Sequence, residues 1–101
     1  MTPSELPPID TPALLIDLDI VDRNLERMQE KANKFEVALR PHIKTHKIPE
    51  LAQLQMRFGA HGITAAKVSE AEVMAAAGIT NIFVANQIVT KEKLHRLAAL
   101  S

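Results

Sequence analysis

The regular alternation of strand-like and helix-like segments is the feature that most constrains how this chain can fold. Helices are predicted to start near residues 49, 70 and 91, so their starts are spaced by about twenty residues. A short segment rich in residues that favour β-strands precedes each helix, at 37–44, 62–68 and 81–86. Strands that alternate with helices in this way pair in parallel through right-handed crossovers. The pattern therefore predicts an α/β fold.

Local signals mark the ends of the predicted helices. Pro49 is tolerated in the first turn of a helix, and Gly78 suits the position just after a helix end. Ser69 and Glu72 have the spacing of an N-terminal capping box, and Thr90 is a suitable N-cap for the last helix. These residues fix the predicted helix boundaries.

The first part of the chain is predicted to contain one further strand and one further helix. Segment 13–21, ALLIDLDIV, is rich in apolar and β-branched residues, as strands are. Asp19 is a plausible N-cap for the helix that follows. Apolar residues then recur at helical spacing and form one stripe, which consists of Val21, Leu25, Met28, Ala32 and Phe35.

The last predicted helix reaches Ser101 without a Gly, a Pro or a charged stop after it. A sheet of three parallel strands also needs cover on both faces, and no further sequence supplies that cover at its outer edge. We therefore expect the chain to be the front part of a longer α/β protein. The alternative is a complete small α/β domain.

The composition is that of a soluble globular protein and disfavours several classes of function. Lys plus Arg and Asp plus Glu number 12 each, so no nucleic-acid or anionic-membrane partner is indicated. With 3 Phe, no Trp and no Tyr, there is no platform on which bases could stack. The absence of Cys excludes disulfides and thiolate metal sites. The N-terminus does not resemble a signal peptide, and no apolar run could span a bilayer, so we expect a cytoplasmic protein.

The stretch LRPHIKTHK concentrates basic side chains on one predicted strand. Side chains alternate across a strand, so Arg40, His42 and Lys44 share one face, opposite an apolar face that includes Leu39 and Ile43. A basic face at the C-terminal end of a strand does not suit a core. In parallel α/β folds, that end of the strands is where ligands bind.

Lys44 is the strongest candidate for chemistry. Like charge from Arg40 and His42, together with partial burial, would favour the neutral amine, which is the form that attacks carbonyl groups. The alternative is a solvated edge strand that carries its basic residues on the wet side. Lys67 also ends a predicted strand, but its apolar neighbours supply no activating charge, so a surface or phosphate-facing role suits it better.

Three other kinds of site are disfavoured. His42, His46 and His61 lie on or near strands, lack an accompanying carboxylate and do not have the spacing of metal ligands. No glycine-rich phosphate-binding motif follows any predicted strand, so nucleotide binding has no support. Asp17 and Asp19 share one strand face, but the expected role of Asp19 as an N-cap argues against a catalytic pair.

Four segments, in this order and spacing, resemble the N-terminal part of the D-threonine aldolase and D-serine dehydratase family. They are DTPALLIDLDIVDRNLERM, LRPHIKTHK, GITAAKVSEAEVMAAAGI and NIFVANQIV. The resemblance covers residues 9–90, and RPHIKTHK is its most specific part. It implies a partial (β/α)₈ TIM-type barrel of the alanine racemase-like, fold type III class: the first three βα units after an N-terminal strand and helix. Residues 1–12 would then be a proline-rich lead, and 13–101 the N-terminal part of the barrel that binds pyridoxal phosphate.

The resemblance also implies the cofactor and the residues near it. The cofactor would be pyridoxal 5′-phosphate, and Lys44 would form the internal aldimine with it. The other residues expected in the cofactor pocket match the motif around Lys44 or fall at later strand ends. They are Arg40, His42, Thr45, His46, Lys67 and Asn86.

The implied activity is that of a lyase acting on D-3-hydroxy amino acids, by aldol cleavage or by dehydration. Members of the family bind a divalent metal through residues near the C-terminus, and no metal ligand is predicted in this chain. We expect the full-length protein to be a homo-oligomer, in the simplest case a dimer, with a small D-amino acid as substrate, and the isolated chain to be inactive. The alternatives are a non-catalytic pyridoxal phosphate carrier of the same barrel type and a small anion-binding interaction module.

Overall fold

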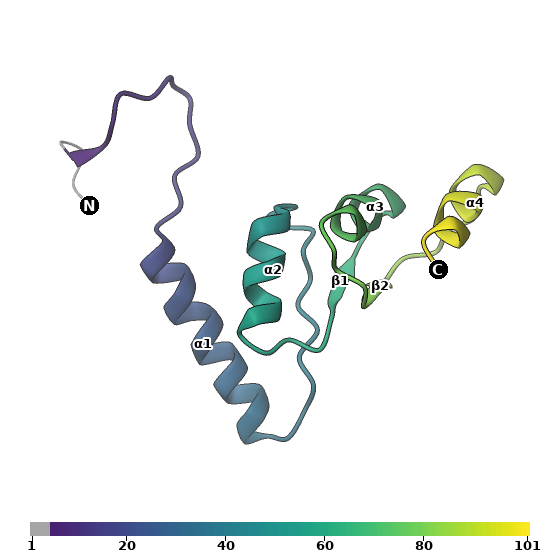
Figure 1. The fold of residues 1–101 in the computed structure, drawn as a ribbon, viewed down its shortest axis with the longest axis horizontal. Coiled ribbons are helices and arrows are strands. Elements are labelled where there is room, and N and C mark those ends of the chain that lie inside the picture. Colours follow the sequence, from purple (N-terminus) through teal and green to yellow (C-terminus); the bar gives the residue numbers. More distant parts are fainter. Residues whose placement is uncertain (1–4) are drawn as a thin grey trace.

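Figure 1 shows the computed structural model, which describes residues 5–101. Within this range two short strands alternate with helices, and the strands pair in parallel, with Ile63 opposite Ile82 and Ala65 opposite Val84. The predicted α/β fold and its parallel pairing are therefore confirmed for these units. The elements are α1 (Leu18–Lys34), α2 (Pro49–Arg57), β1 (Ile63–Ala65), α3 (Val68–Ala76), β2 (Ile82–Val84) and α4 (Lys91–Ala99).

Within the segment predicted as a strand at 37–44, only His42 forms a bridge, opposite Thr64 of β1. The bridge consists of the Thr64 N–H bonded to the Pro41 carbonyl at 2.8 Å and the Ile43 N–H bonded to the Thr64 carbonyl at 2.9 Å. The ladder stops before His42 because Pro41 has no N–H to donate. It stops after His42 because the Ala66 N–H bonds to the Glu70 carboxylate instead. The predicted strand is thus wrong in extent, although its parallel alignment with β1 is present.

The hydrophobic core lies between α2, α3 and the two strands. Ile43 and Ile63 are completely buried, and Met74 of α3 packs with them. Ile43 comes from the apolar face of the 37–44 segment, as predicted, whereas Val37 at its beginning is exposed. The core therefore fixes the end of this segment, just before Lys44, more firmly than its start.

The predicted strand at 13–21 is absent. Residues 13–17 belong to no helix or strand, and α1 already begins at Leu18. The N-cap is Asp17 and not Asp19, because the Asp17 Oδ1 accepts hydrogen bonds from the N–H groups of Asp19 at 3.0 Å and Ile20 at 3.2 Å. A strand also needs a paired neighbour, and no part of residues 5–101 pairs with this segment. Residues 1–4 of the predicted lead lie outside the described residues.

The described chain is extended. Its radius of gyration is 16.2 Å, whereas a compact domain of this length has about 13 Å. Figure 1 shows the N-terminal segment and α1 at one end and α4 at the other. In the α1 stripe only Ala32 is buried, while Met28 and Phe35 are more than half exposed. The apolar face of this helix is thus largely uncovered within residues 5–101.

The start of α3 differs from the prediction. Ser69 and Glu72 do not form the capping box; the helix begins two residues earlier, with Lys67 as N-cap. Glu70 takes the reciprocal position, and its Oε2 accepts the Lys67 N–H at 3.2 Å. The Thr90 cap is confirmed, since its hydroxyl accepts the Lys93 N–H at 3.4 Å.

Glu72, which does not cap α3, instead connects α3 to α4. The Arg96 Nε donates to the Glu72 Oε1 at 3.1 Å and to Oε2 at 3.2 Å. These hydrogen bonds hold the pKa of the Glu72 carboxyl below its usual value and raise that of Arg96. Because the pKa of Glu72 is lowered in the folded state, the contact stabilises the fold fully at pH values above the ordinary carboxyl pKa. This stabilisation is lost as the pH falls through the lowered pKa.

Within residues 5–101, no helix is both long enough and apolar enough to cross a membrane.

Candidate functional site

The candidate site lies where the parallel strands end. The 39–43 segment, which is the part of the predicted 37–44 strand that precedes Lys44, is followed by a turn at 44–47. β1 is followed by Ala66 and Lys67, and β2 is followed by Ala85 and Asn86. The Ala85 N–H bonds to the Ala65 carbonyl at 3.0 Å, so the second and third of these ends are held side by side. Because parallel strands place their carboxyl ends at one edge, the residues that follow them meet there.

The turn at 44–47 presents Lys44 to solvent. The Lys47 N–H closes the turn by bonding to the Ile43 carbonyl at 2.8 Å, and the Lys44 N–H donates to the His42 Nδ1 at 3.2 Å. The Lys44 side chain is exposed, and its amine has no hydrogen-bond or ion-pair partner within residues 5–101. This amine is therefore available to a ligand.

His46 anchors the turn to α2. Its Nδ1 accepts the Ile48 N–H at 2.9 Å, and its Nε2 lies 3.2 Å from the Gln55 Oε1. Because Nδ1 is an acceptor, the neutral ring carries its proton on Nε2 and donates it to Gln55. His46 thus has its ring nitrogens occupied by the protein, whereas Thr45 beside it is exposed.

Arg40 lies at the opposite end of the strands from Lys44. Its Nη1 donates to the carbonyls of Ile63 at 3.3 Å and Asn81 at 3.4 Å, where β1 and β2 begin. Gly62 makes room for this guanidinium, since a Cβ there would lie 2.5 Å from the Arg40 Nη1. The structure therefore does not bring Arg40 beside the Lys44 amine, and the expected like-charge effect of Arg40 has no geometric basis here.

The remaining predicted residues follow β1 and β2. The Asn86 Nδ2 donates to the Ala66 carbonyl at 3.0 Å, so Asn86 ties the end of β2 to the end of β1. Lys67 is exposed, and its amine has no partner among the described residues. His42, Lys44, Lys67 and Asn86 thus lie at one edge of the sheet, while Arg40 does not.

Sequence reasoning missed a contact between Lys47 and Glu70 at this edge. Glu70 is only 6% exposed, and its Oε2 accepts the Ala66 N–H at 2.7 Å. Its Oε1 lies 3.8 Å from the Lys47 Nζ, which also donates to the Lys44 carbonyl at 2.7 Å. The K-x-x-E spacing of Lys67 and Glu70 could have indicated that Glu70 caps the start of α3, but no local signal indicated its contact with Lys47.

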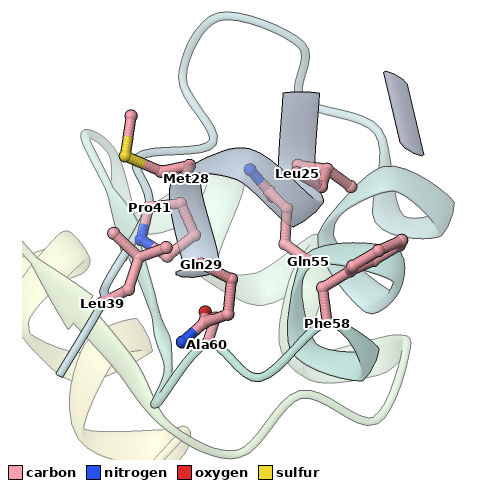
Figure 2. Close-up of a pocket in the computed structure, with 8 residues that line it drawn as sticks. All are labelled: Leu25, Met28, Gln29, Leu39, Pro41, Gln55, Phe58 and Ala60. Carbon is pink, nitrogen blue, oxygen red and sulfur yellow. The ribbon is translucent and has the colours of Figure 1, made fainter. Parts of the chain in front are cut away.

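A small pocket lies on the other side of the 39–43 segment, between that segment, α1 and α2 (Figure 2). Leu39 and Pro41 line it, together with mostly apolar side chains from the two helices. Gln29 of α1 also faces it, and the Gln29 Oε1 is buried without a hydrogen-bond partner among the described residues. Lys44, Lys67 and Asn86 do not line this pocket; Gln55, which contacts His46 of the turn that carries Lys44, does.

Comparison with known proteins places this arrangement in a family. The family described as alanine racemase, N-terminal domain, matches residues 16–101. The chain belongs to this family. The resemblance inferred from the motifs and the barrel-type fold class are both confirmed, apart from the corrected strands.

Individual members of the family are close in sequence and structure. The chain is 47% identical over 93 residues to a D-threonine aldolase of an Arthrobacter species. It is 48% identical over 77 residues to a D-threo-3-hydroxyaspartate dehydratase of Delftia sp. strain HT23. The crystal structure of a D-threonine aldolase from Filomicrobium marinum covers 91% of the chain, with a TM-score of 0.89 and 52% identity. The chain spans 24% of the Arthrobacter protein, 20% of the Delftia protein and 25% of the Filomicrobium chain.

Proposed function

We propose that this chain is the lysine-bearing part of a pyridoxal phosphate-dependent lyase that acts on D-3-hydroxy amino acids. The observation that carries the proposal is the position of Lys44. Its amine is exposed and unpartnered within residues 5–101, at the carboxyl ends of parallel strands. The similar D-threonine aldolase and D-threo-3-hydroxyaspartate dehydratase supply the substrate class.

The described residues fit the cofactor. Pyridoxal phosphate needs an amine that can bond to its aldehyde carbon, and Lys44 offers one that no described residue occupies. Lys67 and Asn86 end the neighbouring strands and would contact the bound cofactor. His42 accepts the Lys44 N–H and so holds the backbone from which the amine extends.

The proposed role of Lys44 has two parts. Its amine would hold the cofactor covalently. The same amine would be placed to move a proton at the substrate Cα, since it stays attached to the same turn. The bound cofactor supplies the electron-withdrawing ring that stabilises the charge formed at Cα.

We propose the remaining properties from the same family relationship. The full-length enzyme would act in the cytoplasm as a homo-oligomer. A divalent metal would be held by residues outside this chain. The choice between aldol cleavage and dehydration also depends on residues outside it, so both reactions belong to the proposal.

The proposal is tested with the full-length protein that carries this sequence, supplied with pyridoxal phosphate and Mn²⁺. We expect it to convert D-threonine to glycine and acetaldehyde, or D-serine to pyruvate and ammonia, and to leave the L-isomers unchanged. Assay of acetaldehyde and ammonia separates the two reactions. A protein that binds the cofactor but consumes neither these two substrates nor D-threo-3-hydroxyaspartate would be a carrier, and one that binds no cofactor would support the interaction module; either result overturns the proposal.

A further inference from the structure

We infer that Lys47 and Glu70 form a clamp that positions Lys44, an inference that rests on the proposed function of Lys44. The Lys47 Nζ donates to the Lys44 carbonyl at 2.7 Å and lies 3.8 Å from the Glu70 Oε1. Its ammonium therefore bridges the turn that carries Lys44 and the start of α3. Neither residue had a role in the sequence-based prediction of the site.

The Glu70 end of the clamp is rigidly held. Its carboxylate is almost fully buried, and its Oε2 accepts the N–H groups of Ala66 at 2.7 Å and Lys67 at 3.2 Å. Asn86 donates to the Ala66 carbonyl at 3.0 Å, so the end of β2 is held against the same loop. Lys47 thus fastens the turn to a part of the protein that is already fixed by several hydrogen bonds.

The contact of Lys47 with Lys44 is the part of the clamp that would affect the position of the reacting amine. The Lys44 side chain has no partner within residues 5–101, so its backbone is what sets the point from which the amine extends. The hydrogen bond from Lys47 to the Lys44 carbonyl fixes the peptide plane that follows Lys44. Small errors in the position of a reacting group reduce rates strongly, by about a hundredfold for 1 Å. Lys47 is therefore a positioning residue that acts through Lys44.

The backbone of Lys47 supports a role for its side chain. Lys47 has a φ of 54°, in the left-handed region that favours glycine over other residues. A turn with no use for a side chain here would be formed more easily by glycine. The residue at this position instead supplies the ammonium that contacts Lys44 and Glu70.

The test uses the full-length protein with Lys47→Met, Glu70→Gln and the double variant, with Lys93→Met as the matched control on an exposed face of α4. Without cofactor, amide exchange at Lys47 should accelerate about tenfold in both single variants. With cofactor, we expect attachment at Lys44 to persist but kcat to fall by ten- to a hundredfold, with KM changed much less. The double variant should lose no more than Lys47→Met alone, because Lys47→Met already removes the contact between Lys47 and Glu70.

Two further results separate the possible failures. If exchange at Lys47 and kcat in both single variants match those of Lys93→Met, the clamp is disproved. If the wild-type protein attaches no cofactor at Lys44, the proposed function fails, and the positioning role fails with it. Lys47→Arg should recover most of the lost kcat, because a guanidinium can also reach both acceptors. No recovery, with kcat as low as in Lys47→Met, would contradict a role for the charge.

Discussion

Replacing Lys44 with alanine in the full-length protein is expected to abolish covalent attachment of pyridoxal phosphate and to lower kcat by about a thousandfold or more. The variant loses both proposed functions of the amine, which are to hold the cofactor and to move a proton at Cα. The fold should tolerate the change, because the Lys44 side chain is exposed and contacts no polar partner within residues 5–101. Attachment is followed by the visible absorbance of the bound cofactor, and kcat by release of acetaldehyde or ammonia.

Lys67→Ala is the matched control for this experiment. Lys67 is also exposed and also follows a strand of the same sheet, so it tests whether any lysine at this edge could serve. We expect Lys67→Ala to keep the covalent attachment, with weaker cofactor binding if Lys67 contacts the cofactor. An unaltered kcat in Lys44→Ala, or loss of attachment in Lys67→Ala only, would remove Lys44 from the mechanism.

Gly62→Ala is expected to cause the second large effect, on stability. A Cβ at Gly62 would lie 2.5 Å from the Arg40 Nη1 and 2.6 Å from the backbone oxygen of Asn81. The backbone before β2 cannot move aside without disturbing the Ile63 N–H, which bonds to the same Asn81 oxygen at 2.9 Å. Overpacking of this kind destabilises a protein by about 1–3 kcal/mol, and the loss of the Arg40 hydrogen bonds adds to it.

The control for Gly62→Ala is Gly78→Ala. Gly78 has a φ of +93°, so alanine is strained there, but a Cβ would meet no atom within 4 Å. We therefore expect Gly78→Ala to cost about 1 kcal/mol and Gly62→Ala to cost about twice that or more. Urea unfolding of the full-length protein, monitored by circular dichroism, measures both. A free energy of unfolding for Gly62→Ala equal to that of the wild type would show that Arg40 does not occupy this space.

The parts of the fold that were predictable depend on local sequence. Helix starts at Pro49 and after Thr90 follow from capping chemistry and periodicity, and both are observed. Segment 13–21 has the composition of a strand, but a strand also requires a neighbour, and composition does not reveal one. Ser69 with Glu72 and Lys67 with Glu70 have the same spacing, so spacing alone does not tell which acid caps α3; in the structure Glu70 caps it, and Glu72 binds Arg96.

The candidate site was predictable to a similar degree. The edge that carries Lys44, Lys67 and Asn86 follows from parallel strands, which local patterns indicate. The contacts of Arg40 and Glu70 could not be predicted from local patterns, because they join segments that lie far apart in the sequence. Arg40 contacts the starts of β1 and β2, and Glu70 contacts Lys47. The roles of the site residues in cofactor binding remain predictions.

The central claim is that Lys44 is the lysine that holds the cofactor, and one measurement tests it directly. The full-length protein is loaded with pyridoxal phosphate, reduced with borohydride, digested and mapped by mass spectrometry. Borohydride makes the link between the lysine and the cofactor permanent, so the labelled peptide identifies the residue. We predict label on Lys44, in the sequence PHIKTHK, and none on Lys47 or Lys67. Label on either of those lysines, with Lys44 unmodified, would contradict the account.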